Sequence, residues 1–322
     1  MRAVVATAQG PPDALRVVEV DDPIPAPGQL LVDVAAAGVN FLDTIVRRGL
    51  LLPQEPPFRL GSEGSGRVAA VGEGVEGVTQ GDRVAWSGAP GSYAERALVP
   101  ADRAVPVPDG VDDDTAASLL AQGLTAHALA VSTHPIGEGD TVVVLAAAGG
   151  VGLLLTQIAA LRGGRVIGVV SSEAKAVHAA DAGAADVIVG YEGFAASVRD
   201  LTGGEGARVV YDSVGRDTFE ESLQSLRPRG LLASYGFSSG SPEPLEPRRL
   251  GPLGSLYLTY VTSMHYAGDR QSLLERSSDL LGWVAEGRLR VTIGGRYPLA
   301  DAARAHADLE GRATHGKLLL IP

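Results

Sequence analysis

A stretch of small and aliphatic residues, TVVVLAAAGGVGLLL at positions 141–155, restricts the fold of this chain more than any other segment. Its first part, Thr141–Leu145, is β-branched or aliphatic throughout, which is typical of a parallel strand buried on both faces. A turn of alanine and glycine follows, and then an apolar helix pattern that stops at Gly163 and Gly164. Strand, tight turn and helix in this order indicate the first half of a dinucleotide-binding βαβ unit.

The turn has the spacing of the glycine-rich dinucleotide-binding fingerprint, with Ala147 at the first position, followed by Gly149 and Gly152. Small residues let a pyrophosphate approach the backbone, and the N–H groups and dipole of a helix N-terminus attract its charge. A second strand pattern, Arg165–Val170, begins where the βαβ unit requires it. A simple packing turn without a ligand is the alternative interpretation.

The residues after the second strand indicate which dinucleotide binds. NAD sites place a carboxylate there for the ribose 2′-hydroxyl, whereas this chain has Ser171, Ser172 and Lys175. Hydroxyl groups and a cation can hold a 2′-phosphate, which a carboxylate would repel. The sequence therefore predicts NADPH as the cofactor, provided that the Glu173 side chain points to solvent. For Lys175, a solvated lysine in the first turn of the next helix is the alternative.

Length, charge and the lack of cysteine limit the remaining possibilities. The 322 residues exceed what one core usually holds, so we expect two domains. A net charge of −11 argues against general binding of nucleic acids or anionic membranes. The sequence shows no secretory or membrane-spanning apolar segment, which favours a cytoplasmic protein. Without cysteine, disulfides, a cysteine nucleophile, thiolate zinc sites and iron–sulfur clusters are excluded.

Patterns along the chain predict two domains, one of which is interrupted by the other. Residues 1–122 hold short apolar runs between Pro- and Gly-rich turns, as in a small β-rich, barrel-like domain. The pattern of residues 123–264 predicts a doubly wound parallel sheet. A helix whose first part is residues 122–130 leads into it. Its strands are expected at Thr141–Leu145, Arg165–Val170, Val187–Val189, Val209–Asp212, Leu231–Tyr235 and Ser255–Val261.

The C-terminal tail, residues 265–322, predicts two helices and a strand. Asp269 is a typical N-cap for the first helix, which Gly287 ends. A second helix at Leu299–Leu309 precedes a strand at Lys317–Ile321. Because no long linker precedes it, we expect this tail to fold back on the first domain.

Several segments, read together, resemble a known superfamily over the whole chain. GVNFLD at 38–43, LGSEGSG at 60–66, GDRV at 81–84, QGLTA at 122–126 and the AAAGGVG turn are similar to medium-chain dehydrogenases/reductases. VVYDSVG at 209–215, RDT at 216–218, SSG at 238–240 and GRATHGK at 311–317 narrow the resemblance to the zinc-independent NADPH:quinone oxidoreductases, the zeta-crystallin-like group.

This resemblance implies an α/β protein with a GroES-like domain at 1–122 and 265–322, a Rossmann domain at 123–264, and NADPH between them. It also implies a homodimer formed through the Rossmann edge strand, here Ser255–Val261. Zinc-containing relatives need thiolates and a Gly-His-Glu segment, but this chain reads Gly61-Ser62-Glu63, so we expect no catalytic zinc. The histidines show no ligand spacing and are expected in structural or surface positions: His127, His134, His178, His265, His306 and His315.

The resemblance further implies which residues form the site. Asn40 and Thr125 would be the catalytic residues near the nicotinamide. The implied cofactor contacts are Asn40, Thr125, Ala148, Gly149, Gly150, Val151, Ser171, Ser172, Lys175, Tyr191, Ser213, Tyr235, Phe237, Ser239 and Arg312. Arg312 has a rationale of its own, because a guanidinium in a loop of small residues suits a phosphate or amide oxygen. An ordinary turn asparagine and a surface arginine are the alternatives for Asn40 and Arg312.

Some positions depart from the family. Ile45 and Leu51 stand where some bacterial members have tyrosines, and Phe237 stands where an asparagine can occur. Tyr191 corresponds only loosely to a tyrosine that can stack in the adenosine site. These departures predict an apolar acceptor pocket that prefers acceptors larger or more hydrophobic than simple benzoquinone.

The expected reaction is hydride transfer from NADPH to a quinone, because alcohol oxidation is disfavoured without a Lewis acid. A quinone oxygen can take its proton from solvent, whereas an enone needs a donor at its α-carbon, either a tyrosine or a bound water. An enone or enoyl double-bond reductase on the same fold is therefore an alternative. An NADPH-binding crystallin-like or RNA-binding protein is an alternative of another class, which the acidic charge disfavours.

Overall fold

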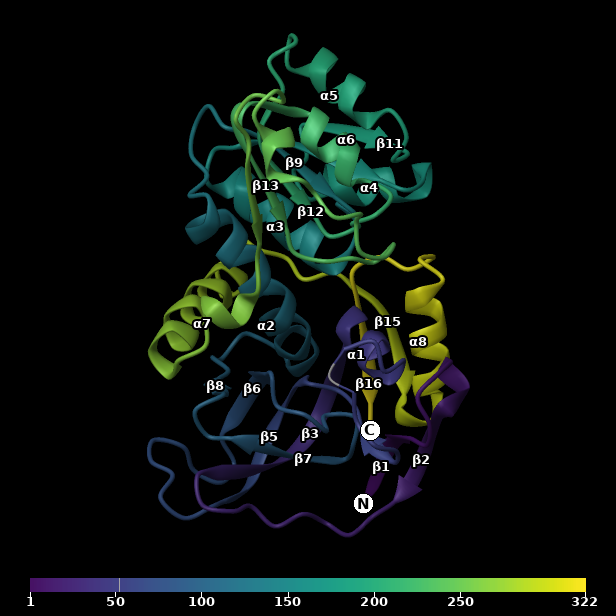
Figure 1. Ribbon diagram of the computed structural model, residues 1–322. Helices are drawn as coiled ribbons and strands as arrows, with labels where there is room; N and C mark the ends of the chain where they lie inside the picture. The colour runs from purple at the N-terminus through teal and green to yellow at the C-terminus, as the bar shows by residue number, and fades with distance from the viewer. Residues whose placement is uncertain (52) are drawn as a thin grey trace. The chain divides into compact units, whose positions relative to one another are not determined.

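The computed structural model describes residues 1–51 and 53–322 (Figure 1). The chain forms two compact units: residues 1–124 with 267–322, called here the β-rich unit, and residues 125–266, called the parallel-sheet unit. The C-terminal tail belongs to the β-rich unit because β16 (Lys317–Ile321) pairs antiparallel with β3 (Gln29–Val39). None of the helices in the described residues is long and apolar enough to span a bilayer.

The parallel-sheet unit has the doubly wound sheet that the sequence predicts. Among the described residues its strand order is β11-β10-β9-β12-β13-β14, with parallel pairing throughout. This order, in which the first strand along the chain lies near the centre, is typical of a dinucleotide-binding fold. The bounds are β9 (Thr141–Leu145), β10 (Arg165–Val170), β11 (Asp186–Val189), β12 (Ala207–Asp212), β13 (Leu226–Ser234) and β14 (Tyr257–Tyr260).

Buried side chains from both faces of this sheet explain its uninterrupted apolar strands. Val143 and Leu145 of β9 pack in one core with Phe194 and Phe219, which come from the helices on that face. Neighbouring side chains of a strand point to opposite faces, and Val144 is equally buried, so β9 is covered on both sides. The helices are α3 (Gly150–Leu161), α4 (Glu173–Asp181), α5 (Phe194–Leu201) and α6 (Phe219–Gln224).

The β-rich unit is built around the long strand β3, which pairs with β5, β7 and β16. One sheet has the order β15-β16-β3-β5-β6-β8, and a smaller one has the order β2-β1-β4. Their bounds are β1 (Arg2–Ala6), β2 (Leu15–Glu19), β4 (Phe58–Arg59), β5 (Glu63–Val71), β6 (Arg83–Ser87), β7 (Arg96–Pro100), β8 (Ala104–Pro106) and β15 (Ile293–Pro298). Trp86 and Tyr93 are fully buried in the core of this unit.

One helix of the β-rich unit starts earlier than the sequence predicts. The helix expected to start at 122–130 is α2 (Asp113–His127), which continues as a π-helix at Ala128–Thr133. It starts earlier because Asp112 Oδ1 accepts the backbone N–H of Thr115 at 2.7 Å, a capping bond that sets the first turn. The remaining helices are α1 (Phe41–Arg47), α7 (Arg270–Ala285) and α8 (Ala302–Glu310); Asp269 caps α7 as predicted.

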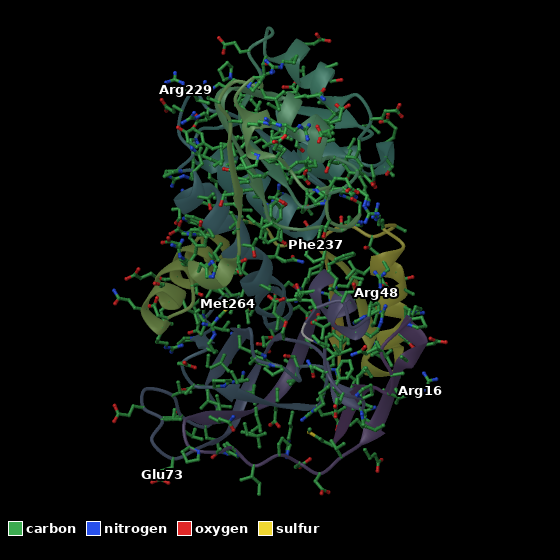
Figure 2. The ribbon with its side chains drawn as sticks, viewed as in Figure 1. Arg16, Arg48, Glu73, Arg229, Phe237 and Met264 are labelled. Carbon is green, nitrogen blue, oxygen red and sulfur yellow. The ribbon has the colours of Figure 1, made fainter. Side chains whose placement is uncertain are left out.

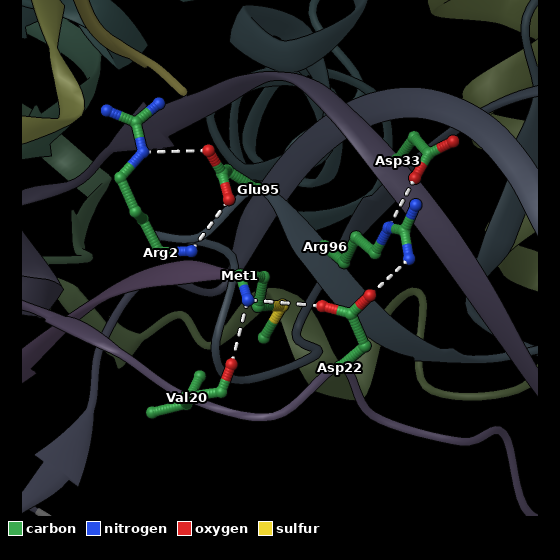
Figure 3. A network of polar contacts seen from close by, with 7 residues as sticks. All are labelled: Met1, Arg2, Val20, Asp22, Asp33, Glu95 and Arg96. Carbon is green, nitrogen blue, oxygen red and sulfur yellow. Dashed lines mark hydrogen bonds and ion pairs between the residues drawn. The ribbon is translucent and has the colours of Figure 1, made fainter.

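A network of ion pairs ties the N-terminus to this unit (Figure 3). The Met1 amino group donates to the Val20 carbonyl at 2.8 Å and lies 3.2 Å from Asp22. Arg96 bridges Asp22 at 2.6 Å and Asp33 at 2.8 Å, which links β7 and β3 to the segment after β2. Because the Arg96, Asp22 and Asp33 side chains are substantially exposed, each pair contributes little to stability on its own.

Candidate active site

The carboxyl edge of the parallel sheet gathers most of the predicted cofactor contacts, because parallel strands end at a common edge. The residues follow the strands in turn: Ala148, Gly149, Gly150 and Val151 after β9; Ser171, Ser172 and Lys175 after β10; Tyr191 after β11; Ser213 after β12; Tyr235, Phe237 and Ser239 after β13. Figure 2 labels Phe237 in the last of these loops. The loops therefore bring these predicted residues to one edge of the unit.

The turn from β9 into α3 leaves no room for larger side chains. A Cβ atom added at Gly152 would lie 2.8 Å from Ala147 Cα and closer still to the Ala146 carbonyl oxygen. The first N–H groups of a helix have no acceptor within it, so those of Gly150 and Val151 can bind an anion. The turn thus has the packing and the donors that a pyrophosphate site requires.

A buried carboxylate that no sequence pattern points to shapes the loop after β12. Asp212 is 1% exposed and accepts hydrogen bonds from Val214 N at 2.8 Å, Gly215 N at 3.0 Å and Thr218 Oγ1 at 2.8 Å. Ser239 joins the neighbouring loop to this one, since its N and Oγ both donate to the Val214 carbonyl, at 2.8 and 2.7 Å. Asp212 therefore orders the loop after β12, and Ser239 fixes the loop after β13 relative to it.

Tyr235 carries a buried hydroxyl at this edge. It has no hydrogen-bond partner of normal geometry in the described part of the chain. Burial raises the pKa of Tyr235, and the nearby Ser213 hydroxyl opposes part of that rise. A buried polar group without a partner is expected where a ligand supplies one, so this edge fits a dinucleotide that brings its own hydroxyl and phosphate groups.

The segment predicted to distinguish NADPH from NADH lies at the N-terminus of α4. Ser172 is the N-cap residue of α4, and its carbonyl accepts the backbone N–H of Lys175 at 3.0 Å. Ser172 and Lys175 are half-buried, whereas Ser171 and Glu173 are exposed. The Glu173 carboxylate is therefore in solvent, which is the condition set above for NADPH.

A separate cluster surrounds Asn40 in the β-rich unit. Asn40 follows the last residue of β3, Glu63 is the first residue of β5, and Lys317 is the first residue of β16. Both neighbouring strands run antiparallel to β3, with Leu318 opposite Val39. Their first residues are therefore brought beside the end of β3.

The contacts in this cluster are short and buried. Lys317 Nζ forms an ion pair with Glu63, and both side chains are 0% exposed. Lys317 Nζ also donates to Asn40 Oδ1 at 2.7 Å, while Asn40 Nδ2 donates to Glu63 Oε2 at 3.1 Å. Glu63 belongs to the Gly61-Ser62-Glu63 segment, but no sequence pattern indicates a role for Glu63 or Lys317.

A second buried chain of hydrogen bonds adjoins Asn40. Asp43 Oδ2 accepts from the Asn40 backbone N–H at 2.8 Å and from the Tyr93 hydroxyl at 2.9 Å. The hydroxyl lies 3.1 Å from His306 Nε2, and Arg47 Nη1 donates to His306 Nδ1 at 3.0 Å. Because arginine can only donate, a neutral His306 carries its hydrogen on Nε2 and donates it to Tyr93. Each donor in this series of hydrogen bonds, from Arg47 through His306 to Tyr93, therefore points toward Asp43.

Burial shifts the titration of these groups in opposite directions. It raises the pKa of Asp43 from 3.8 to about 6, although the Asn40 and Tyr93 hydrogen bonds favour the charged form. It lowers the pKa of His306 from 6.5 to about 3, and the Arg47 charge adds to this effect. Burial also raises the pKa of Tyr93 well above its usual value. At neutral pH His306 is therefore neutral, as the hydrogen-bond directions require.

The remaining predicted residues are divided between the two units. Thr125 is half-buried in the last turn of α2 and belongs to the parallel-sheet unit. Arg312 is exposed after α8 in the β-rich unit, with φ of 55°. Ile45 is buried at 6% exposure, whereas Leu51 is 40% exposed. Across residues 1–51 and 53–322, no group of three or more His, Asp or Glu side chains is arranged to hold a metal ion.

Comparison with known proteins yields matches over both units. Residues 26–109 match the family described as alcohol dehydrogenase GroES-like domain, and residues 150–279 match the family described as zinc-binding dehydrogenase. The chain is 41% identical over 317 residues to a quinone oxidoreductase of Salmonella typhimurium, covering 97% of each chain. It is 40% identical over 328 residues to a 2-haloacrylate reductase of a Burkholderia species, covering 99% of this chain and 98% of the other.

A solved structure agrees with these matches. A mycobacterial protein complexed with NADPH is 46% identical, superposes with a TM-score of 0.97, and each chain covers 100% of the other. The predicted fold class, a GroES-like β-rich domain with a doubly wound parallel sheet, is confirmed.

Proposed function

The chain belongs to the quinone oxidoreductase family of medium-chain dehydrogenases/reductases, and from this premise we propose that it reduces quinones with NADPH by zinc-independent hydride transfer. The observation that carries the proposal is similarity along the full length to a quinone oxidoreductase, joined to a sheet edge with the donors and the orphan hydroxyl that a dinucleotide fits. When bound, NADPH supplies a hydride from its nicotinamide ring.

The roles of the residues follow from their chemistry. The N–H groups of Gly150 and Val151 bind the pyrophosphate, while Ser172 and Lys175 hold the 2′-phosphate. The buried hydroxyl group of Tyr235 forms a hydrogen bond with the cofactor. We assign Asn40 and Thr125 to the nicotinamide, as the family implies, and we also assign Asn40 to the acceptor. The quinone gains the hydride and one solvent proton, and is released as hydroquinone.

The residues of the β-rich unit also bear on metal independence. Zinc sites of dehydrogenases take thiolate or imidazole ligands. This chain has no cysteine, Ser62 stands where the zinc-containing relatives have a histidine, and Glu63 forms an ion pair with Lys317. Hydrogen bonds from protein side chains, rather than a zinc ion, therefore polarise the acceptor. This suits a quinone or an activated enone, because each is already electrophilic.

A second candidate acceptor is an activated alkene, which the likeness to a 2-haloacrylate reductase favours. In that reaction the hydride adds to the β-carbon and the α-carbon takes a proton. The two candidates differ in what is consumed along with NADPH, so one assay decides between them.

The first experiment follows NADPH oxidation by the purified protein with 1,4-naphthoquinone, 9,10-phenanthrenequinone, benzoquinone and 2-chloroacrylate in parallel. We expect turnover of the quinones, with a higher kcat/KM for the larger ones because the acceptor pocket is apolar. Turnover of the acrylate alone would move the activity to alkene reduction. A flat response across the quinone sizes would reject the apolar pocket, and no turnover with any acceptor would reject the proposed function.

Lys175→Met should change the choice of cofactor. A charge-assisted bond to the 2′-phosphate contributes about 1.5–3 kcal/mol, so the kcat/KM ratio of NADPH to NADH should fall about 10- to 100-fold. NADH has no 2′-phosphate and provides the internal control, since its kcat/KM should change far less. An unchanged ratio would contradict the assignment of Lys175.

We also propose that the protein is a homodimer through β14. Tyr257, Leu258 and Tyr260 on this edge strand are 61%, 40% and 56% exposed. An unpaired strand edge with exposed apolar side chains is suited to pairing with a second copy. The cytoplasmic location stays a prediction from the sequence.

A further inference from the structure

Three side chains that meet at the end of β3 leave one hydrogen-bond donor unused. Lys317 Nζ donates to Asn40 Oδ1, and Asn40 Nδ2 donates to Glu63 Oε2. An ammonium group can only donate and a carboxylate can only accept, so these contacts determine which end of the amide faces which partner. If the amide flipped, it would place a donor against a donor and an acceptor against an acceptor.

The groups that hold Asn40 are themselves held firmly. Glu63 and Lys317 are fully buried, and Glu63 Oε1 also accepts the Ala121 N–H at 2.6 Å. Gly38 leaves the space for them, because a Cβ atom there would lie 2.6 Å from both Glu63 Oε2 and Lys317 Cε. Of these three side chains, only that of Asn40 has exposed surface; it is half-buried.

We propose that Glu63 and Lys317 are positioning residues, which lock the Asn40 amide and leave one Nδ2–H for the carbonyl oxygen of the acceptor. No described residue accepts this second hydrogen. The carbonyl oxygen gains negative charge as the hydride arrives, and a donor that is oriented in advance stabilises it without reorganisation. The inference rests on the proposed function, in which Asn40 acts at the acceptor.

The kinetic test asks whether the pair acts through Asn40. Asn40→Ala should lower kcat about 100-fold, the usual loss for one oxyanion donor. Glu63→Met/Lys317→Met removes the lock without leaving a buried charge unpaired, and should lower kcat at least about 10-fold with little change in the KM for NADPH. Adding Asn40→Ala to this pair should lower kcat no further than Asn40→Ala alone, because residues that act as one unit are not additive.

A second readout needs no substrate. Asn40 is the only asparagine in the 322-residue sequence, so selective ¹⁵N-asparagine labelling gives a single side-chain amide in the NMR spectrum. We expect a rigid amide in the wild type, with an order parameter of about 0.8, and a mobile one below about 0.6 in Glu63→Met/Lys317→Met. Arg83→Met/Asp113→Asn, which removes a 2.7 Å ion pair of the same unit that does not contact Asn40, is the matched control and should leave the amide rigid.

The two readouts separate this inference from the proposed function. An inactive wild type with a rigid amide that the double variant releases would reject the function and its donor role, but support the lock. Full kcat in the double variant, multiplied losses in the triple variant, or an amide that stays rigid without Glu63 and Lys317 would each overturn the positioning role.

Discussion

Replacing Lys317 by methionine should lower the free energy of unfolding by about 3–5 kcal/mol. The ammonium group is fully buried against Glu63, so its removal leaves a carboxylate without its counter-charge in the core. Burying such a charge alone is far more costly than burying the pair. Urea unfolding, followed by circular dichroism, measures the loss.

The chain provides its own matched control. It has only two lysines, Lys175 and Lys317, and Lys175 is half-buried on α4. Lys175→Met should therefore change stability by no more than about 0.5 kcal/mol in the absence of cofactor. Glu63→Met/Lys317→Met should recover most of the loss, because apolar side chains of similar length replace the pair. A Lys317→Met loss below about 1 kcal/mol, or a double variant less stable than the single one, would contradict this account.

The parallel-sheet unit could be predicted from the sequence because each of its elements is encoded by neighbouring residues. Thr141–Leu145 and Arg165–Val170 are found with the predicted bounds as β9 and β10. Their apolar runs, the small-residue turn and the glycine stop of α3 lie within 30 positions, so period and punctuation are sufficient. The common edge at which the cofactor loops gather then follows from parallel pairing alone.

The surroundings of Asn40 could not be predicted in this way. Glu63 and Lys317 are 254 positions apart, and both are types that are almost never fully buried unless they are paired. Their meeting depends on β5 and β16 lying on either side of β3, which no local pattern reveals. His306 could be placed among structural histidines, but its partner Tyr93 lies 213 positions away. Long-range strand pairing, rather than local preference, creates this part of the site.

Asp43 and His306 should give the stability of the protein two opposing dependences on pH. Burial makes Asp43 hold its proton more tightly in the folded state, with a pKa of about 6 against 3.8. Its contribution to stability is therefore fully present below pH 3.8 and is lost as the pH rises to about 6. Burial makes His306 harder to protonate, with a pKa of about 3 against 6.5. Its contribution is fully present above pH 6.5 and is lost as the pH falls toward 3.

Removing one group should expose the dependence of the other. Between pH 4 and 6 the two contributions change with opposite slopes of about 1.4 kcal/mol per pH unit, so they cancel in the wild type. Asp43→Asn should therefore gain stability relative to the wild type as the pH rises, by about 3 kcal/mol in all. His306→Gln should gain relative to the wild type as the pH falls below 6.5. Free energies of unfolding at pH 4, 5, 6 and 7 give both difference curves.

The comparison with the wild type at each pH cancels the titration of every other group, which makes the sign of each slope decisive. Both variants remove a group from the hydrogen-bonded chain through Tyr93, so each should also show a constant loss of about 1–3 kcal/mol that does not depend on pH. Only the slope reports the shifted pKa. Two flat curves, or two curves with slopes of the same sign, would mean that burial does not raise the pKa of Asp43 and lower the pKa of His306 in the folded protein.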